Sequence, residues 1–442
     1  MQRYLASLLI GAGLFAGCAG VEPADIRDLR ELPQDPLAYV AAGDLDRPLI
    51  DAATQQHLYQ QFRQQWLAAW DPNAARPSPE SVQKHFLDYA AKPGYGENLL
   101  PHSPDFARKL ASLARIDNCD QPAITVVNTS LRQMPTQRPR FDEVGKPGEG
   151  FPFDSLQESS LCAGTPVRLW LVSSDRQWGL VSSPCGQGWV LLRDVAAVDA
   201  ATIELYRTAP LVCLMRDGMV VGLPPWGQVA IQTHIGAVFP LKNIDKYGLH
   251  VLVPVYQSAR CTMVTATVGP EDAAVMPLPA TPRTVATLAG QMIGQPYGWG
   301  GMFDSRDCSS TTRDLMIPLG VPLPRNSSDQ ARAYAAIDLK DLPPQQREQV
   351  LLDKGVPFAT LVRFPGHIAL YVGQRGGRAL ILHNTWGVKT RRGGVEGRKL
   401  IGRCVVTTLQ PGEELRDLDR TKGDLRARME CLVQIGQRSQ VK

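Results

Sequence analysis

Apolar residues recur at every fourth position near the start of the chain. The positions are Leu58, Phe62, Trp66 and Trp70. A period close to that of an α-helix predicts a helix over residues 51–70 whose aromatic stripe faces a hydrophobic core, with a partner-binding stripe as the less favoured interpretation. Two more helical patterns follow, at residues 82–91 and 104–116. We therefore expect a mostly helical N-terminal arm over residues 45–120.

The pattern changes near residue 123, where short β-branched and aromatic runs alternate with turn residues. Such closely spaced runs predict small β-barrels. The first barrel, expected over residues 121–200, resembles a bacterial SH3 domain in the segments Gly164-Thr165-Pro166-Val167, Asp175-Arg176-Gln177-Trp178 and Gly188-Trp189-Val190. A diverged second copy is expected over residues 201–270, followed by a proline-rich linker at 271–283.

The last part of the chain mixes both patterns. An amphipathic stretch at 284–293 predicts a helix that ends at the run Gly294-Gln295-Pro296-Tyr297-Gly298-Trp299-Gly300-Gly301, and a second helix is expected over 309–316. Apolar runs predict strands at residues 360–364, 367–373, 379–383 and 401–409. The expected class is α+β, with a catalytic domain over residues 284–442 that ends in a basic, helical segment at 424–435 of no assigned function.

Two histidines lie on the strands of the predicted hairpin. Paired positions in an antiparallel hairpin have a constant sum, so a five-residue loop at 373–377 places His367 opposite His383. A shorter loop shifts the register by one to three residues and still leaves the two imidazoles close. Two neighbouring imidazoles are not a usual core pattern, so they indicate chemistry.

Composition narrows the classes of function. The chain has 442 residues, 35 prolines and 39 glycines, which favours several small, turn-rich domains. The formal net charge is only +4 and no long Lys/Arg run is present. Nucleic acid is therefore not an expected partner, and we expect a monomer.

The first residues are typical of an export signal. A short basic start, Met1 to Arg3, precedes an apolar stretch and the small residues before Cys18. The segment resembles a lipoprotein signal that ends at residue 17, with Phe15 where leucine is common; the alternative is an ordinary signal peptide. We expect Cys18 to be lipidated and residues 18–44 to form a tether. In a Gram-negative host, Ala19 favours an outer-membrane lipoprotein facing the periplasm; otherwise the protein is exported and membrane-anchored.

The chain has nine cysteines, and an oxidising compartment permits disulfides. Lipidation uses Cys18, and a nucleophilic Cys308 must stay free. Proximity in sequence suggests three disulfides, Cys162–Cys185, Cys213–Cys261 and Cys404–Cys431. Seven candidate cysteines cannot all pair, so at least one further thiol remains.

Cys308 follows an Asp and opens a predicted helix, Ser309 to Met316. The positive end of the helix dipole favours the thiolate, so we expect a pKa below the usual value of about 8.5. His367 would then accept the thiol proton, and His383 would orient the imidazole of His367. The order Cys, His, polar residue along the chain is that of papain-like proteases, which form an acyl-enzyme.

Two other interpretations of these residues remain. Cys308, His367 and His383 could bind zinc with a water, or Cys308 could be a buried structural thiol. Neither is favoured, because no second ligand lies near Cys308 in sequence. The glycine-rich run fits no nucleotide-binding spacing, so no cofactor and no metal are expected, and its glycines are expected to allow a tight turn or a close approach to substrate.

At this point a family resemblance is clear. The glycine-rich run, Asp307-Cys308-Ser309, the segment from Pro324 to Gln330, Gly366-His367-Ile368-Ala369 and His383 resemble the NlpC/P60 family of cysteine peptidases over residues 284–409. The resemblance implies cleavage of peptidoglycan stem peptides between γ-linked D-glutamate and a diamino acid, usually meso-diaminopimelate.

The resemblance also implies roles for individual residues. Tyr297 is similar to the tyrosine that stabilises the oxyanion, and the residues lining the substrate subsites are Asp307, Ser309 and Ser327. The role of Arg325 stays open, with pairing to a carboxylate as one possibility.

In some relatives an acidic residue of the first SH3 unit binds the free amine of an N-terminal L-Ala. Asp154 and Glu158 are the candidates for this role here. Two alternatives to the endopeptidase remain: a cell-wall-binding lipoprotein without activity, and an amidase or transpeptidase on the same fold.

Overall fold

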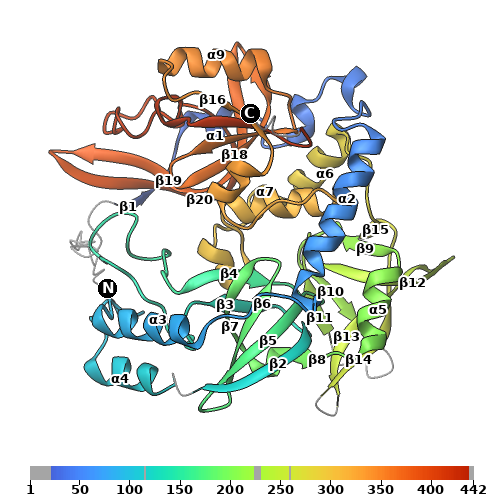
Figure 1. Cartoon of the computed structure of the whole chain (residues 1–442). Coiled ribbons are helices and arrows are strands. Elements are labelled where there is room, and N and C mark those ends of the chain that lie inside the picture. The colour runs from blue at the N-terminus through green and yellow to red at the C-terminus, as the bar shows by residue number, and fades with distance from the viewer. Residues whose placement is uncertain (1–20, 114–115, 223–229, 258–259, 438–442) are drawn as a thin grey trace, which may run out of the picture.

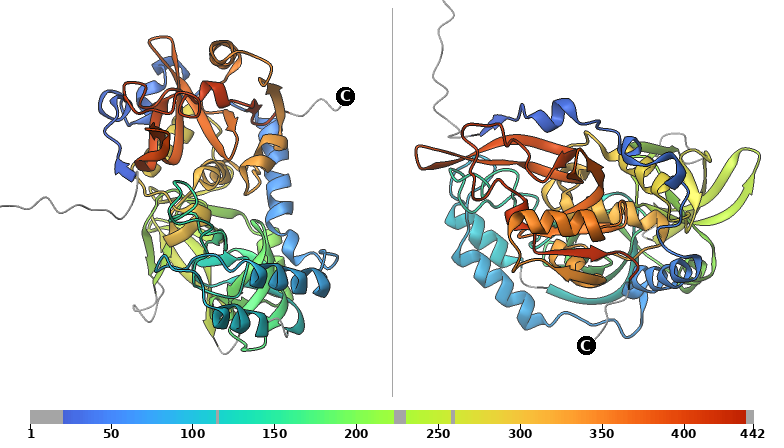
Figure 2. Two further views of the ribbon diagram at one scale, coloured as in Figure 1. Left: turned by 90° about the vertical axis from the view of Figure 1, so that its left-hand side faces the viewer. Right: turned by 90° about the horizontal axis from the view of Figure 1, so that it is seen from above.

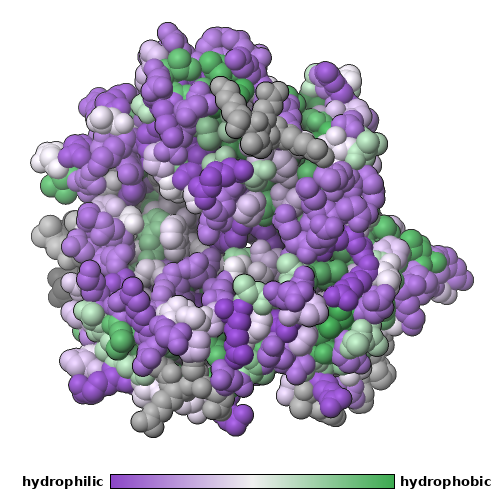
Figure 3. Space-filling model, in the orientation of Figure 1, coloured by the Kyte–Doolittle hydropathy of each residue, from purple (hydrophilic) through white to green (hydrophobic). Residues whose placement is uncertain are grey.

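The computed structural model describes residues 21–113, 116–222, 230–257 and 260–437. The chain forms two lobes (Figures 1 and 2). The upper lobe in Figure 1 holds the C-terminal domain, and the lower lobe holds two β-rich units and helices of the N-terminal arm. In this orientation the surface is mainly hydrophilic and is hollowed on the left, between the lobes (Figure 3). Within the described ranges, no helix combines the length and apolar character needed to cross a membrane.

The upper lobe is built on a seven-stranded sheet with the order β1-β20-β19-β18-β17-β21-β16. Helices α6 (Pro282–Met292) and α7 (Cys308–Met316) contribute buried residues to its core. The other elements are β1 (Val21–Pro23), α8 (Ser327–Ala333), β16 (Ala335–Asp338), α9 (Pro344–Lys354), β17 (Thr360–Phe364), β18 (His367–Arg375), β19 (Arg378–Arg392), β20 (Val395–Thr408) and β21 (Cys431–Gln434). The α+β class is confirmed.

The lower lobe contains a twelve-stranded sheet that runs through both β-rich units. Unit 1 comprises β2 (Ile116–Thr125), β3 (Thr129–Arg132), β4 (Gln157–Leu161), β5 (Pro166–Ser173), β6 (Trp178–Ser183), β7 (Gly186–Leu191) and β8 (Val195–Ala197). Unit 2 comprises α5 (Ala200–Thr208), β9 (Leu211–Leu214), β10 (Met219–Gly222), β11 (Ala230–Thr233), β12 (Val238–Asp245), β13 (Gly248–Gln257), β14 (Arg260–Val268) and β15 (Ala273–Val275). Since β15 pairs with β9, residues 271–283 are not only a linker: their first part belongs to unit 2.

The aromatic helix joins the two lobes. In α2 (Ala52–Trp66), Leu58 packs into the core of the upper lobe. Phe62 and Trp66 belong to a buried cluster that also holds Trp70 and residues of both β-rich units. The interpretation of a core-facing stripe is confirmed. The arm continues with α3 (Pro79–Ala91) and α4 (Pro104–Ser112) along unit 1 (Figure 1).

Residues 21–44 were expected to form a tether, and this expectation is wrong for this segment. β1 pairs in parallel with β20, and helix α1 (Arg27–Glu31) follows. Ile26 is fully buried, and the Asp28 carboxylate accepts two 2.8 Å hydrogen bonds from the backbone N–H and hydroxyl of Thr408. Prolines made the segment look extended, but its few apolar residues dock on a distant sheet edge. The signal sequence and Cys18 lie outside the described residues.

The C-terminal segment 424–435 is not a helix as expected. A 3₁₀ turn at Arg426–Arg428 leads into β21, which lies between β17 and β16. Leu432 and Val433 are fully buried there. A strand of this length is fixed by its long-range partners, which local periodicity does not reveal.

The three suggested disulfides are wrong: all six cysteines are free. Cys404 lies on β20 and Cys431 on β21, with β19, β18 and β17 between them. Since neighbouring strands lie about 4.8 Å apart, this pair is far beyond bonding distance. Cys213 is buried with its Sγ 3.6 Å from the carbonyl oxygen of Ala274, and Cys162 contacts a histidine described below.

Candidate active site

Cys308 is the first residue of α7, directly after a well-formed helix cap. The Asp307 carboxylate accepts from the backbone N–H of Ser310 at 2.9 Å, and the Ser310 hydroxyl accepts from the backbone N–H of Asp307 at 2.9 Å. This reciprocal capping box fixes where the helix begins. The Cys308 side chain is only 8% exposed and packs beside the start of β18, next to the backbone N–H of Ile368.

Asp307 and Ser309 are held by Arg325. Arg325 donates to both carboxylate oxygens of Asp307, at 2.6 and 3.2 Å, and to the Ser309 hydroxyl at 2.9 Å. It also donates to Ser159 of β4 at 2.8 Å. All four residues are buried. Arg325 therefore pairs a carboxylate, and the polar atoms expected to line substrate subsites are engaged within the protein; Ser327, at the start of α8, is partly exposed.

The glycine-rich run packs against unit 1. Gly300 and Gly301 have φ values of +60° and +81°, and a Cβ at these positions would lie 2.4 Å from the Gln157 carbonyl oxygen and the Ser160 hydroxyl oxygen. Glycine is required here because β4 is so close. The expected tight turn is present at these glycines, and the close neighbour of their backbone is β4 of unit 1.

The two histidines meet, as predicted. His367 Nε2 lies 2.8 Å from His383 Nδ1. The connecting turn is shorter than five residues: Gly376 and Gly377 join β18 to β19, both with positive φ. This turn shifts the register from the expected one, and a bulge between Tyr371 and Gly373 partly reverses the shift. The histidines are thus diagonal neighbours instead of directly opposed.

Thr407, on β20, fixes the tautomer of this pair. Its hydroxyl donates to the Thr408 carbonyl at 2.8 Å, so the oxygen must accept from His383 Nε2–H at 3.1 Å. His383 Nδ1 then accepts from His367 Nε2–H. His367 Nδ1 is left unprotonated, which is the form that a general base needs. No pattern in the sequence indicates Thr407, because its role depends on the pairing of β19 with β20.

The pKa values of Cys308 and His367 do not agree with the expected thiolate. Burial, and then the nearby Asp307 carboxylate, raise the pKa of Cys308 to about 12. Burial, and then His383, hold the pKa of His367 well below its usual range. Both groups lose solvation when charged, so the resting site holds a neutral thiol and a neutral imidazole. The expectation of a depressed thiol pKa is wrong for this enclosed site.

Alkylation of Cys308 should follow this protonation state. Because the pKa of the thiol is raised, the thiolate fraction is small at pH 7, and the rate with iodoacetamide should rise about tenfold per pH unit from pH 7 to 9. Peptide mass spectrometry over this pH range measures the rate. Fast alkylation that is independent of pH between 6 and 8 would instead indicate a thiolate–imidazolium pair.

Aromatic side chains surround the cleft beside the histidines. The cleft has a volume of about 230 Å³ and is lined by His367, His383, Tyr297, Trp299 and Trp386, with Phe153 reaching in from unit 1. The Phe153 ring lies 5.2 Å from that of Trp299 and 6.2 Å from that of Trp386. Burial, and then the neighbouring Cys308, raise the pKa of Tyr297 well above its usual value, so its phenol stays a donor.

Asp154 and Glu158 are not in this cleft. The Asp154 carboxylate is buried, pairs with Arg132 at 2.6 Å and accepts from the backbone N–H groups of Arg140 and Leu156. It lies at the edge of a separate cavity of about 780 Å³ between unit 1 and Met302–Asp304. Glu158 binds Gln133 and lines a third cavity beside α3. Neither carboxylate is placed to hold an amine next to Cys308.

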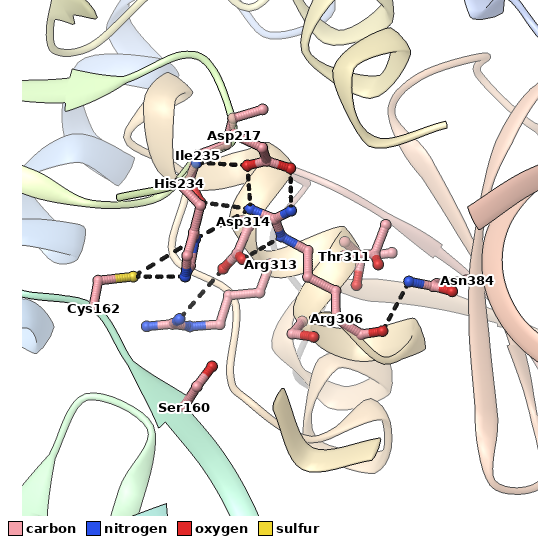
Figure 4. Close-up of polar contacts among 12 residues, drawn as sticks. Ser160, Cys162, Asp217, His234, Ile235, Arg306, Thr311, Arg313, Asp314 and Asn384 are labelled. Carbon is pink, nitrogen blue, oxygen red and sulfur yellow. Dashed lines mark hydrogen bonds and ion pairs between the residues drawn. The ribbon is translucent and has the colours of Figure 1, made fainter. Parts of the chain in front are cut away.

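A buried polar cluster fixes the chain on both sides of the site (Figure 4). Arg306 donates to Asp217 of unit 2 at 2.6 and 2.9 Å and to Asp314 of α7 at 2.7 Å. Its carbonyl accepts from Asn384, the neighbour of His383, at 2.8 Å. At its far end, His234 lies 3.4 Å from Cys162 of unit 1; burial opposes protonation, but Cys162 raises the pKa of His234 to about 9. The cluster therefore connects unit 1, unit 2 and β19 to the start of α7.

A buried thiol at a helix start, a neutral histidine held by a second polar side chain, and a phenol donor define a papain-like cysteine peptidase site. Family models match three segments: the N-terminal NLPC_P60 stabilising domain at residues 5–118, an SH3 domain of the SH3b1 type at 139–191 and the NlpC/P60 family at 294–395. The protein is an NlpC/P60 family cysteine peptidase with an N-terminal stabilising domain and an SH3b domain. None of these three segments covers unit 2, and the first one crosses the boundaries expected at residues 17 and 44.

Solved structures resemble the chain to different extents. An NlpC/P60 endopeptidase from Photobacterium damselae subsp. piscicida is 26% identical over 95% of this chain and 99% of that chain, with a TM-score of 0.83. An NlpC/P60 family protein from Bacillus cereus matches at 16% identity over 71% of this chain and 99% of that chain, with a TM-score of 0.48. The peptidoglycan hydrolase RipB from Mycobacterium tuberculosis is 20% identical over 34% of this chain and 62% of that chain, with a TM-score of 0.20. No curated protein matches the chain.

Proposed function

We propose that the protein is a peptidoglycan hydrolase that cuts stem peptides between γ-linked D-glutamate and meso-diaminopimelate. The contact between His367 and His383, with Thr407 behind it, carries this proposal, because it leaves Nδ1 of His367 as a free basic nitrogen. His367 precedes Ile368, whose backbone N–H lies beside the thiol of Cys308. The activity of the Photobacterium relative, named as an endopeptidase, supports the reaction class. Peptidoglycan as the substrate is supported by the family and by the name of RipB.

The reaction follows from the site. As Cys308 Sγ attacks the scissile carbonyl carbon, its proton passes to His367 Nδ1. The charge that develops on the carbonyl oxygen is stabilised by the Tyr297 phenol. The imidazolium of His367 then gives its proton to the leaving amine, and a water hydrolyses the thioester with His367 again as base.

The engaged carboxylate of Asp154 argues against binding of a free L-Ala amine there. We propose that Asp307, Ser309 and Ser327 act mainly by shaping the wall of the cleft on the D-glutamate side. We also propose that Cys18 is lipidated after export and that the enzyme, a monomer, is anchored with its active site facing the cell wall.

The test is cleavage of L-Ala-γ-D-Glu-meso-diaminopimelate by the mature protein under reducing conditions, followed by mass spectrometry. The expected product is L-Ala-D-Glu, released by the wild type and not by Cys308→Ala. Absence of turnover with this peptide and with purified murein would overturn the proposal. Release of intact stem peptide from glycan would instead identify an amidase.

A further inference from the structure

The catalytic cleft has a strongly cationic end. Its lining includes four basic side chains, Lys389, Arg398, Lys422 and Arg428, and no carboxylate among the described residues that form its wall. Lys389 and Arg398 belong to the β19–β20 hairpin, whereas Lys422 and Arg428 come from the C-terminal segment. The NlpC/P60 family match ends at residue 395, so three of these four residues lie beyond it. We call these four residues the cation cluster.

The carboxylates near the cation cluster already have cationic partners, and Glu396 pairs with one member of the cluster, Lys422. Glu396 pairs with Arg391 at 2.9 Å and with Lys422 at 2.6 Å. Asp419 pairs with Arg391 at 3.4 Å and caps backbone N–H groups. Glu430 faces Arg363 at 3.9 Å. In the part of the chain that the structure describes, neither Lys389 nor Arg398 has a carboxylate within ion-pair distance.

Gathering these cations has an electrostatic cost. Burial, and then the charges of Arg398, Arg428 and Lys422, lower the pKa of Lys389. Burial is also the first cause that lowers the pKa of Arg398 and of Arg428. Partly buried like charges destabilise a fold, and a bound anion offsets this cost. Gly148 of unit 1 keeps the space open, because a Cβ there would lie 2.9 Å from the Arg398 guanidinium.

The position of the cation cluster identifies the half of the substrate that it meets. Arg428 donates to the Pro365 carbonyl at 3.0 Å, two residues before His367, and its charge also lowers the pKa of His367. His367 is the acid that protonates the leaving amine. Groups beyond His367 along the cleft therefore contact the leaving half of the substrate, which is the diamino acid in the proposed reaction.

We propose that the cation cluster is a subsite for the free carboxylates of the leaving diamino acid, and that the enzyme prefers stem peptides whose diaminopimelate carboxyls are unblocked over those in which they are amidated. The inference rests on the proposed function. It also assigns a role to the C-terminal basic segment: this segment completes the subsite from outside the family core. Charge-assisted hydrogen bonds from guanidinium to carboxylate are the interaction that this chemistry provides.

The test compares kcat/KM for L-Ala-γ-D-Glu-meso-diaminopimelate with that for the same peptide carrying diaminopimelate amides. The wild type should cleave the acid about 10- to 100-fold better, since a hydrogen bond to a charged group contributes about 1.5–3 kcal/mol. Arg398→Gln and Lys389→Gln should each lower kcat/KM for the acid by more than they lower it for the amide, and so reduce this preference. Arg392→Gln, exposed at the tip of the same hairpin, is the matched control.

Two outcomes would overturn the inference: equal cleavage of acid and amide by the wild type, or an equal loss for both peptides in Arg398→Gln. If no peptide is cleaved, the proposed function fails, and binding then tests the subsite separately. Calorimetry with meso-diaminopimelate should show binding to Cys308→Ala and at least tenfold weaker binding to Cys308→Ala/Arg398→Gln. Equal affinities would reject the subsite, and unchanged circular dichroism would exclude misfolding as the cause.

Discussion

Replacing Cys308 with alanine should lower kcat for stem-peptide cleavage by on the order of 10⁴- to 10⁶-fold. In the proposed reaction the thiol forms the acyl-enzyme, and removing it leaves Tyr297 and the cleft to stabilise a direct attack by water. KM should change little, because the Cys308 side chain is almost fully buried and contributes little binding surface. Single-turnover kinetics with the diaminopimelate tripeptide would measure this loss.

A variant of the proposed general base, His367, gives a second test of this prediction. His367→Ala should cost about as much as Cys308→Ala, and the double variant should be no worse than either single variant, because the two groups act in one step. Cys185→Ala, whose thiol lies in a different cavity, should keep wild-type activity. Additive losses in the double variant, or more than 1% of wild-type kcat in Cys308→Ala, would contradict a shared role.

The side chains of the candidate site were predictable because their chemistry is encoded in short segments. Cys308 follows a capping residue, and His367 and His383 flank a turn, so local pattern and strand periodicity were enough to bring them together. The register of the paired strands could not be predicted from local sequence. The two-residue turn at Gly376-Gly377 and the bulge near Gly373 together set the diagonal contact, and their combined effect emerges only when β18, β19 and β20 form one sheet.

The predictions for the segments that contain β1 and β21 were wrong for the same physical reason. β1 and β21 each gain their stability from partners far away in sequence: β1 from β20, and β21 from β16 and β17. Local composition made the first look like a tether and the second like a helix. The same limit applies to protonation. A helix start predicts a thiolate only when the site is open, and the burial of Cys308 arises from the assembled domain, not from residues near it in sequence.

Arg325→Met should destabilise the protein by about 3–5 kcal/mol at pH 7. The substitution leaves the Asp307 carboxylate buried without its partner and removes the contacts to Ser309 and Ser159. Although burial opposes it, Arg325 lowers the pKa of Asp307 in the folded state. Stability from this pair is therefore present at neutral pH and lost as the pH falls through the range in which Asp307 is protonated. Urea unfolding followed by tryptophan fluorescence at pH 7 and pH 4 should show the larger loss at pH 7.

A second substitution separates charge from packing. Asp307→Asn keeps a residue that can cap α7 while removing the charge, so the double variant Asp307→Asn/Arg325→Met should be more stable than Arg325→Met alone. Arg332→Met, on the exposed face of α8 and paired only with Asp329, is the matched control and should change stability by less than about 1 kcal/mol. If Arg325→Met were no more destabilising than Arg332→Met, the buried pair would not hold the start of α7. In that case the position of Cys308 would depend instead on the Arg306 cluster, which reaches the same turn from unit 2.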